Sequence, residues 1–435
     1  MPKIIRLILL VGLLIVAFTA VKAQAAEPRI DVLHAEGTIN PVLANYIERG
    51  IDQAEEDNAV ACIIQMDTPG GLDTAMRDIV KDIVNAEVPV VVYVSPSGAR
   101  AASAGVFITM AAHVAAMAPN TAIGAAHPVA IGTEGEVQMS EEMAEKVVND
   151  AAAYIRSIAE AHGRNMEWAE KAVRESVSAT EQEALELNII DTIAPDLDSL
   201  VSQLDGWQVA MIDESVVIIH TQGATINHIE MSASESFIYT ISNPNIAVIL
   251  LSLAMLGITV EILNPGLIFP GVFGGISAFL AAYSLGFLPI NYAGIALIGL
   301  AAGLLIAEVY TPGFGLLATG GIIAFVFGNL ILFSGRPTLF QPDLPVIIGI
   351  AVGVGSIIAF IIYHALRAHR RQPTTGREEL VGKKAVVKAA LEPKGTVLHD
   401  GELWTAVLDE GRAEPGEEVT ITKFDSLKLY VTKKQ

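Results

Sequence analysis

The sequence predicts a protein of three parts: an exported α/β domain, a set of membrane-spanning helices and a small all-β barrel. Strand-like and helix-like segments alternate from Ala26 to about Asn243, five long apolar stretches follow, and short β-like runs fill the segment after Gly376. With 52% hydrophobic and 17% charged residues among 435, the chain is too apolar to be one soluble domain. Part of it is therefore expected to lie in lipid.

The N-terminus has the three-part pattern of a secretory signal. Lys3 and Arg6 precede an apolar run at residues 7–20, and the small-residue motif Ala23-Gln-Ala25 follows. This pattern predicts a signal peptide over residues 1–25 and export of the domain that follows. An uncleaved anchor is the alternative, and it leaves the orientation unchanged.

The exported domain, residues 26–240, is predicted to hold layers of helices around a largely parallel sheet. Its apolar strand-like runs are continuous rather than alternating, which is typical of strands buried on both faces. The single cysteine, Cys62, lies in such a run and reads as a small buried residue, and no intrachain disulfide can form. Strands are predicted at 30–34, 60–66, 88–94 and 189–193, and helices at 41–55, 73–86, 140–162 and 166–172.

A serine elbow follows the strand at 88–94. Ser103 is flanked by alanines and Gly105 where strand gives way to helix, so its hydroxyl would project and the N–H of Ala104 could bind an oxyanion. Upstream, another strand ends in Pro69-Gly70-Gly71, where paired glycines let backbone N–H groups point at a ligand. The two strand ends are predicted to face one acyl group.

A nucleophilic serine needs a base, and two residues are candidates. Lys146 lies on the helix predicted at 140–162; in an apolar cleft its amine could be neutral, whereas on the surface it would pair with Glu142 or Asp150. His127 has a side chain suited to general-base work, and its structural alternative is a histidine at a strand end.

The apolar stretches predict a five-helix transmembrane domain over residues 244–367. They lie at 245–263, 267–288, 293–309, 314–333 and 344–366, each about the length of a spanning helix. The basic cluster at 367–371 places the end of the last span in the cytoplasm by the positive-inside rule. An odd number of spans after an exported domain predicts the same. The break at 264–266 is also compatible with a re-entrant turn.

The membrane segment contains an internal repeat. Glu261, followed by Pro265-Gly266 and by Gly274-Gly275, recurs as Glu308 with the same companions, Pro312-Gly313 and Gly320-Gly321. Each glutamate could lie at the membrane interface or serve as a buried polar anchor. The paired glycines would permit close helix contact.

After a polar linker at 368–380, residues 381–435 predict a small barrel of the OB type. Five β-like runs recur at roughly ten-residue spacing, and Trp404 reads as part of the barrel core. Most of the net charge of −21 lies in residues 27–240, whereas the C-terminal segment is nearly neutral. Neither part is basic, which argues against nucleic acid as a partner and favours a protein-docking role for the barrel.

Several motifs together resemble the NfeD family of membrane-bound, ClpP-class serine proteases. They are the run at 67–72, Ala-Ala-Ser-Ala-Gly at 101–105, the run at 117–124 and the helix around Lys146 that ends at 154–157. The resemblance covers nearly the whole chain and implies a ClpP/crotonase-like fold with a Ser103–Lys146 dyad. It also implies an oxyanion hole from Gly70 or Gly71 with Ala104. His127 falls near the position of the ClpP histidine and stays an alternative base.

The resemblance further implies cleavage of hydrophobic segments of membrane-associated proteins, with a stomatin- or flotillin-like partner. No metal or other cofactor is expected. The protein is expected to form a homo-oligomer. The competing hypothesis is a non-catalytic membrane scaffold that organises such a partner. A crotonase-type acyl-CoA enzyme is disfavoured because an exported domain would not normally meet coenzyme A.

Overall fold

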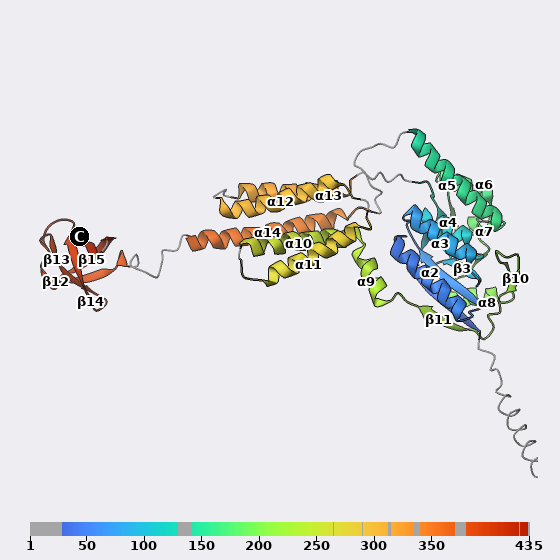
Figure 1. The fold of residues 1–435 in the computed structure, drawn as a ribbon, viewed down its shortest axis with the longest axis horizontal. Coiled ribbons are helices and arrows are strands. Elements are labelled where there is room, and N and C mark those ends of the chain that lie inside the picture. The colour runs from blue at the N-terminus through green and yellow to red at the C-terminus, as the bar shows by residue number, and fades with distance from the viewer. Residues whose placement is uncertain are drawn as a thin grey trace, which may run out of the picture. The chain divides into compact units, whose positions relative to one another are not determined.

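The computed structural model describes residues 28–128, 141–263, 265–288, 290–311, 315–334, 340–369, 380–425 and 427–433. These residues form an α/β domain, a set of apolar helices and a β-barrel, which confirms the predicted fold class (Figure 1). The predicted signal peptide at 1–25 and most of the predicted linker at 368–380 lie outside the described residues.

The α/β domain is organised around one sheet of six strands in the order β11-β1-β2-β3-β5-β8. Every neighbouring pair is parallel. Because parallel strands align their carboxyl ends, the segments that follow β2 and β3 leave the sheet at the same edge. The Pro-Gly-Gly motif follows β2 there. The strands are Arg29–Glu36 (β1), Ala61–Asp67 (β2), Val90–Val94 (β3), Val114–Met117 (β5), Thr192–Ile193 (β8) and Thr225–Ile229 (β11).

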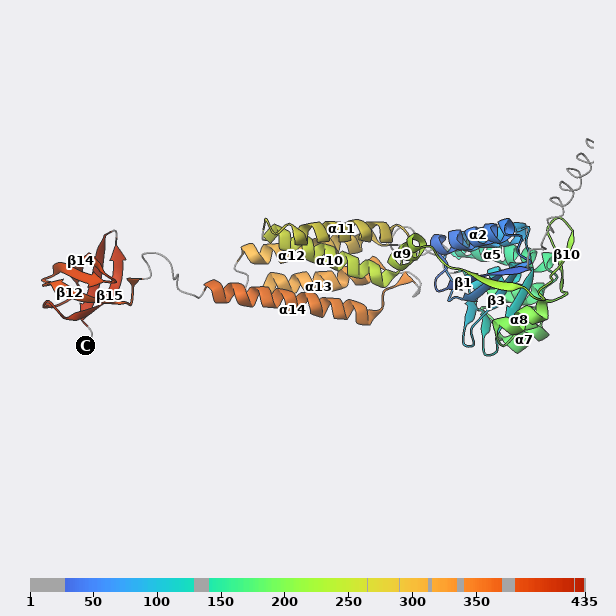
Figure 2. The same cartoon turned by 90° about the horizontal axis from the view of Figure 1, so that it is seen from below.

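Helices cover both faces of this sheet, as the continuous apolar strands predict. Leu33, Ile64 and their neighbours pack on one face against α2 (Pro41–Glu56), α3 (Asp73–Asn85) and α4 (Ala104–Ala111). Val32 and Ile63 point to the other face, where α8 (Leu197–Leu204) covers them. Figure 2 shows α2 and α8 on opposite sides of β1 and β3. Cys62 is fully buried within the first layer, as expected.

A second, smaller sheet carries the serine elbow. It consists of β4 (Arg100–Ala102), β6 (Ala122–Gly124) and β7 (Ser178–Thr180), with β4 parallel and β7 antiparallel to β6. Helix α4 begins directly after β4. Strands of three residues are too short to carry a readable period, so the sequence did not predict this sheet. The two sheets with α4 between them make up the ClpP/crotonase-like architecture that the resemblance implies.

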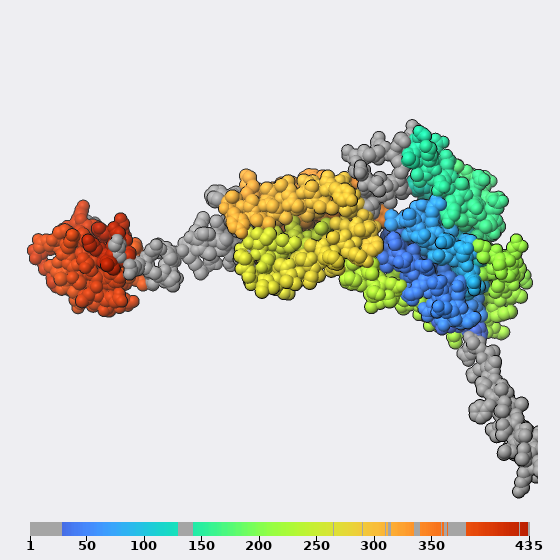
Figure 3. Space-filling model, in the orientation of Figure 1, coloured from blue at the N-terminus to red at the C-terminus, as the bar shows by residue number. Residues whose placement is uncertain are grey.

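The remaining elements of this domain complete its outer layer. Helices α5 (Glu141–Ala161) and α6 (Met166–Arg174) pack together, and Figure 3 shows them in teal on an outer surface. They are followed by α7 (Glu181–Glu186), the hairpin β9 (Gln208–Ala210) and β10 (Val216–Ile218), and α9 (Ala233–Ile241).

The strand predicted at 189–193 is shorter than expected and covers only Thr192–Ile193. The N–H groups of Ile189 and Ile190 instead donate to the carbonyl oxygen of Ala184 and close the end of α7. Both isoleucines are buried all the same, which explains why the run looked like a strand.

All five apolar stretches are helical. Over the described residues, α10 is the one helix that is both long and apolar enough to cross a membrane, and the apolar part of each of the other four helices is shorter. The break after α10 is a short connection, and α10 packs closely on α11. A Cβ built on Gly257 would lie 2.8 Å from the Cα of Gly274, so small residues permit this contact. The helices are Pro244–Leu263 (α10), Phe269–Leu285 (α11), Tyr292–Tyr310 (α12), Leu316–Leu332 (α13) and Leu344–His369 (α14).

The two repeat glutamates lie at equivalent positions: Glu261 is near the end of α10, before α11, and Glu308 is near the end of α12, before α13. Glu308 is buried, and its two carboxylate oxygens accept the N–H groups of Gly315 (2.7 Å) and Ala318 (3.0 Å) at the start of α13. Helix starts leave such N–H groups without intrahelical partners, and a carboxylate complements their positive end of the helix dipole. Glu308 is therefore a buried polar anchor.

Glu261 makes a weaker version of the same contact. Its Oε1 accepts the N–H of Gly266 at 3.4 Å, and its Oε2 is buried without a partner among the described residues. A Cβ on Gly271, in the first turn of α11, would lie 2.7 Å from the Cγ of Glu261. Glu261 is only partly buried and accepts one long hydrogen bond, so the structure gives the buried-anchor contact to Glu308 alone.

The C-terminal segment forms a closed five-stranded barrel in the order β12-β13-β14-β16-β15, consistent with the predicted OB type. Trp404 is half-buried against the barrel core and meets Phe424 edge to face, with 5.9 Å between the ring centroids. It thus packs with the core, as predicted. The strands are Lys384–Ala389 (β12), Lys394–His399 (β13), Glu402–Leu408 (β14), Glu418–Asp425 (β15) and Lys428–Lys433 (β16).

Candidate active site

Ser103 stands at the junction of β4 and α4 in a strained backbone conformation. Its φ is +53° and its ψ is −111°, a region that residues with a side chain rarely adopt. The N–H of Ser103 donates to the carbonyl oxygen of Gly124 on β6 (3.1 Å), and its own carbonyl accepts the N–H of Val106 (3.0 Å). These bonds hold the elbow from the neighbouring strand and from the helix.

The hydroxyl of Ser103 is not used as a helix cap. A serine at the start of a helix commonly accepts a first-turn N–H, but no such bond forms at α4. Over the part of the chain that the structure describes, its Oγ has no hydrogen-bond partner, and the residue is partly exposed. The strained turn therefore presents a free hydroxyl at the surface of the domain.

The Pro-Gly-Gly segment lies in contact with this serine. Gly70 has a φ of +118°, and a Cβ built on it would lie 2.7 Å from the Cβ and 3.2 Å from the Oγ of Ser103. Only glycine satisfies both the backbone conformation and the close approach. The two motifs thus meet at the contact between Gly70 and Ser103.

The backbone N–H groups around Ser103 differ in their availability. The N–H of Gly70 donates to Oγ1 of Thr68 at 3.0 Å. Those of Gly71 and Ala104 have no acceptor among the described residues. Ala104 opens α4, where the helix dipole adds positive potential. Gly71 and Ala104 are therefore the free donors of this site, and Gly70 provides the space beside the serine.

Asp67 and Thr68 fasten the end of β2 to β4. The Oδ1 of Asp67 accepts the N–H of Arg100 at 3.0 Å. The N–H of Thr68 donates to the carbonyl of Arg100 (2.7 Å), and the carbonyl of Thr68 accepts the N–H of Ala102 (3.0 Å). Thr68 is fully buried. Sequence reasoning missed this role, although both residues belong to the motif that it singled out.

Lys146 is not brought to Ser103 in the structure. It lies near the start of α5, its side chain is 66% exposed, and its Nζ is 2.8 Å from Oε1 of Glu142. Further along α5, Tyr154 stacks with Phe107 of α4, with 6.0 Å between the ring centroids. The second half of α5 thus packs on α4, while the first half carries Lys146 in a surface ion pair.

His127 is held in one orientation close after β6. Its Nδ1 lies 2.8 Å from the carbonyl oxygen of Val173. Because a carbonyl can only accept, Nδ1 carries the hydrogen and Nε2 of the neutral ring is left as an acceptor. His127 is exposed, and it makes no hydrogen bond to Ser103 among the described residues. Its ring has the tautomer that a general base needs.

Arg164 anchors the far end of α4. It is buried, and its Nη1 donates to the carbonyls of Met110 (2.6 Å) and Ala112 (2.8 Å), while Nη2 pairs with Asp191 at 2.7 Å. These carbonyls end the helix that begins at Ser103, so Arg164 fixes the helix along its axis. Sequence reasoning did not find it, because nothing local marks an arginine in a turn as a cap of a distant helix.

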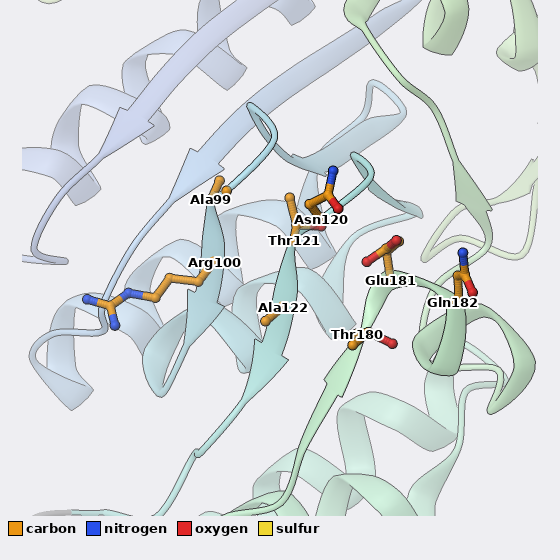
Figure 4. Close-up of a pocket in the computed structure, with 9 residues that line it drawn as sticks. Ala99, Arg100, Asn120, Thr121, Ala122, Thr180, Glu181 and Gln182 are labelled. Atoms are coloured by element: carbon orange, nitrogen blue, oxygen red, sulfur yellow. The ribbon is translucent and has the colours of Figure 1, made fainter.

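A hollow of about 530 Å³ lies at the opposite end of the small sheet from Ser103. Arg100, Asn120, Thr180 and Glu181 line it, and Figure 4 shows the Arg100 side chain extending away from Glu181. No ion pair spans it among the residues described. Among all residues that the structure describes, no three His, Cys, Asp or Glu side chains lie together in a group that could hold a metal ion.

Three family models match consecutive parts of the chain. The N-terminal domain of NfeD1b matches residues 29–229, the NfeD integral membrane domain residues 245–364, and the NfeD-like C-terminal, partner-binding domain residues 377–433. Among curated proteins, the chain is 34% identical to the membrane-bound protease PH1510 of Pyrococcus horikoshii over 98% of each chain. It is 28% identical to the membrane protein NfeD1b of Bacillus subtilis over 97% of each.

Solved structures similar to the chain cover its N-terminal half. One is the 1510-N membrane-bound stomatin-specific protease, a lysine-to-alanine variant in complex with a substrate peptide; it is 33% identical, covers 50% of this chain and 98% of its own, and has a TM-score of 0.45. A serine-to-alanine variant is 35% identical, covers 48% and 100%, and has a TM-score of 0.44. Because the full-length relative is 34% identical and family models match all three parts, this chain belongs to the NfeD family of membrane proteins.

Proposed function

We propose that this protein is a membrane-anchored serine endopeptidase in which Ser103 is the nucleophile. The observation that carries the proposal is the contact between the strained Ser103 elbow and Gly70; the N–H groups of Gly71 and Ala104 have no acceptor among the described residues. Strain at a residue with a free hydroxyl is typical of sites that perform chemistry. The 34% identity to a protein named as a membrane-bound protease supports the same conclusion.

The reaction follows from these groups. The Oγ of Ser103 attacks the carbonyl carbon of the scissile peptide and gives its proton to a base, and the carbonyl oxygen becomes an oxyanion. The N–H groups of Gly71 and Ala104 donate to that oxyanion. The C–N bond then breaks as the protonated base gives its proton to the leaving amine. Water hydrolyses the resulting ester in a second round of the same steps.

Lys146 is proposed as the base, with His127 as the alternative. The resemblance supports Lys146, but an ammonium paired with Glu142 cannot accept a proton, so this role requires Lys146 to leave Glu142. The Nε2 of His127 has no partner among the described residues. A lysine base gives activity that rises toward alkaline pH as neutral amine forms, whereas a histidine base gives a plateau near neutrality.

The test is covalent labelling with a fluorophosphonate probe, together with peptide cleavage, on the full-length protein. Ser103→Ala, Lys146→Ala and His127→Ala are compared with the wild type. We expect losses of about 10³-fold or more for Ser103→Ala and for the true base, because nucleophile and base act as a unit. Full cleavage by Ser103→Ala would refute the protease at this site. Loss in His127→Ala with Lys146→Ala active would assign the base to His127.

A non-catalytic scaffold is the second candidate, and one observation favours it. Among the described residues, no base contacts Ser103, since Lys146 pairs with Glu142 and His127 with Val173. A wild type that is inert to the probe and to every peptide would support the scaffold.

The substrates proposed are hydrophobic segments of a stomatin- or flotillin-like membrane protein. The relative of known structure is described as stomatin-specific. Cleavage of an apolar peptide is to be compared with cleavage of a polar peptide of the same length. Equal rates for both would contradict this substrate class.

The α/β domain is proposed to lie outside the cytoplasm and the barrel inside, separated by five spans. The basic run at 367–371 and the five apolar helices support this orientation. Protease added to cells without their outer barrier should digest a tag near Ala26 and spare one at Gln435. Digestion of both tags would refute the span count.

A further inference from the structure

Helix α9 contacts the loop that follows β1 through one tyrosine. The hydroxyl of Tyr239 donates to the carbonyl oxygen of Glu36 at 2.7 Å and lies 3.3 Å from that of Thr38. Between them, Gly37 has a φ of +94°, and a Cβ on it would lie 2.6 Å from the tyrosine oxygen. The hydroxyl therefore fits only because residue 37 is glycine. Burial raises the pKa of Tyr239 to about 12, so the hydroxyl keeps its proton as a donor.

The same loop holds the glycine segment beside Ser103. Gly37 donates its N–H to the carbonyl of Asp67 (2.9 Å), and Ile39 donates its N–H to that of Gly70 (2.9 Å). The carbonyl of Ile39 accepts the N–H of Leu72, also at 2.9 Å. Three backbone hydrogen bonds thus align residues 37–39 with residues 67–72. A shift of the loop would shift the segment that contains Gly70 and Gly71.

Helix α9 is itself fixed at its start. Ser232 and Glu235 form a capping box, and Glu235 also makes a two-pronged ion pair with Arg49 of α2, at 2.9 and 2.8 Å. The pKa of Glu235 is lowered to about 2, chiefly by its hydrogen bonds with Arg49. Only two residues separate α9 from α10, and the hydroxyl of Ser284 on α11 donates to the carbonyl of Ile241.

We propose that Tyr239 is a positioning residue that links the first membrane helix to the oxyanion-binding segment. It sets the loop at 36–38, that loop sets residues 67–72, and these residues hold Gly70 in contact with Ser103. The inference rests on the proposed function, since it names what holds that site in register. The chemistry at Ser103 is thereby coupled to the segment that enters the membrane.

The experiment compares Tyr239→Phe with Tyr93→Phe in the full-length protein in detergent. Tyr93 is a matched control, because its buried hydroxyl donates to the carbonyl of Ala194 at 2.8 Å and its pKa is also raised to about 12 by burial. Both variants lose one hydroxyl that donates to a backbone carbonyl, but only the hydroxyl of Tyr239 donates to the loop at 36–38. We measure kcat and KM for a cleaved peptide, the rate of fluorophosphonate labelling, and amide hydrogen exchange of residues 67–72.

We expect Tyr239→Phe to lower kcat and the labelling rate about tenfold with KM changed less than about twofold, because small displacements of catalytic donors reduce the rate. Exchange at residues 67–72 should accelerate. Tyr93→Phe should stay within about twofold of the wild type. Equal activity and exchange in the two variants would overturn the inference. If Tyr239→Phe fails to fold, Glu235→Gln, which loosens α9 from α2, takes its place with the same expectation.

An inert wild type would refute the proposed function but not this link, since exchange at 67–72 reports on the link without catalysis. In that case, faster exchange in Tyr239→Phe alone supports the link, and unchanged exchange overturns it.

Discussion

Replacing Gly70 by alanine tests the contact on which the candidate site depends. The new Cβ would lie 2.7 Å from the Cβ of Ser103, whereas non-bonded carbons settle at about 3.5–4.0 Å. One of the two residues must therefore move by roughly 1 Å. Ser103 is tied to Gly124 and to α4, so the displacement falls on the glycine segment and moves the N–H of Gly71.

Gly70→Ala has two expected effects: backbone strain lowers the folding stability, and displacement of groups at the site lowers the rate. Alanine at a φ of +118° costs roughly 1–3 kcal/mol of folding free energy. Misplacing a reacting group by about 1 Å lowers the rate on the order of 100-fold. We therefore expect Gly70→Ala to lose modest stability and about two orders of magnitude in kcat. The assays are thermal unfolding and the rate of probe labelling at Ser103.

Gly98→Ala is the matched control. Gly98 has a φ of +94°, close to that of Gly70, but a Cβ there meets no atom within 4 Å. It should lose similar stability and keep its activity. If Gly70→Ala labels and cleaves as fast as Gly98→Ala, the reasoning from the Gly70–Ser103 contact is refuted.

The remaining predictions concern pH and the membrane helices. Burial, followed by the charge of Arg164, lowers the pKa of His113 and His162 from 6.5 to about 4, so the unfolded chain binds their protons first. The stability that these two histidines contribute is present above pH 6.5 and is lost as the pH falls toward 4. In thermal unfolding, His162→Asn should therefore lose less stability between pH 6.5 and pH 4 than the wild type does. An equal loss in the variant and the wild type would contradict this assignment. Glu308→Leu leaves two helix N–H groups without acceptors, whereas Glu261→Leu removes the acceptor of one long hydrogen bond. Glu308→Leu should therefore lower the thermal stability in detergent more than Glu261→Leu does. No change in either variant would leave both glutamates as interfacial residues.

The elements of the α/β domain could largely be predicted because their signals are local. The helix expected at 41–55 is Pro41–Glu56, and the strand expected at 60–66 is Ala61–Asp67. Burial on both faces of a parallel sheet demands continuous apolar runs, and such runs are visible in sequence. The five apolar helices and the five barrel strands were predicted because their signals, long apolar stretches and short regularly spaced β-like runs, are local too. The three-residue strands β4, β6 and β7 were not, since they exist only through their pairing.

The candidate site was predicted in part. Ser103 and the Pro-Gly-Gly motif were expected to meet, and Gly70 contacts Ser103. The roles of Lys146 and His127 stay predictions; the structure places Lys146 in the surface ion pair that its spacing also allowed. Tyr239 could not be found from sequence, because its partners lie about 200 residues earlier in the chain.

The sequence by itself determined the chemistry available at each point: a serine between small residues, two glycines after a buried strand, and apolar stretches long enough to form membrane helices. Only the tertiary structure decided that, among the described residues, the N–H of Gly71 has no acceptor while that of Gly70 is bonded to Thr68. It also decided that Ser103 takes a positive φ, which no local preference of serine favours. The physical reason is that the partner of a backbone group, and the strain it can sustain, depend on segments that folding brings together from far apart in the chain.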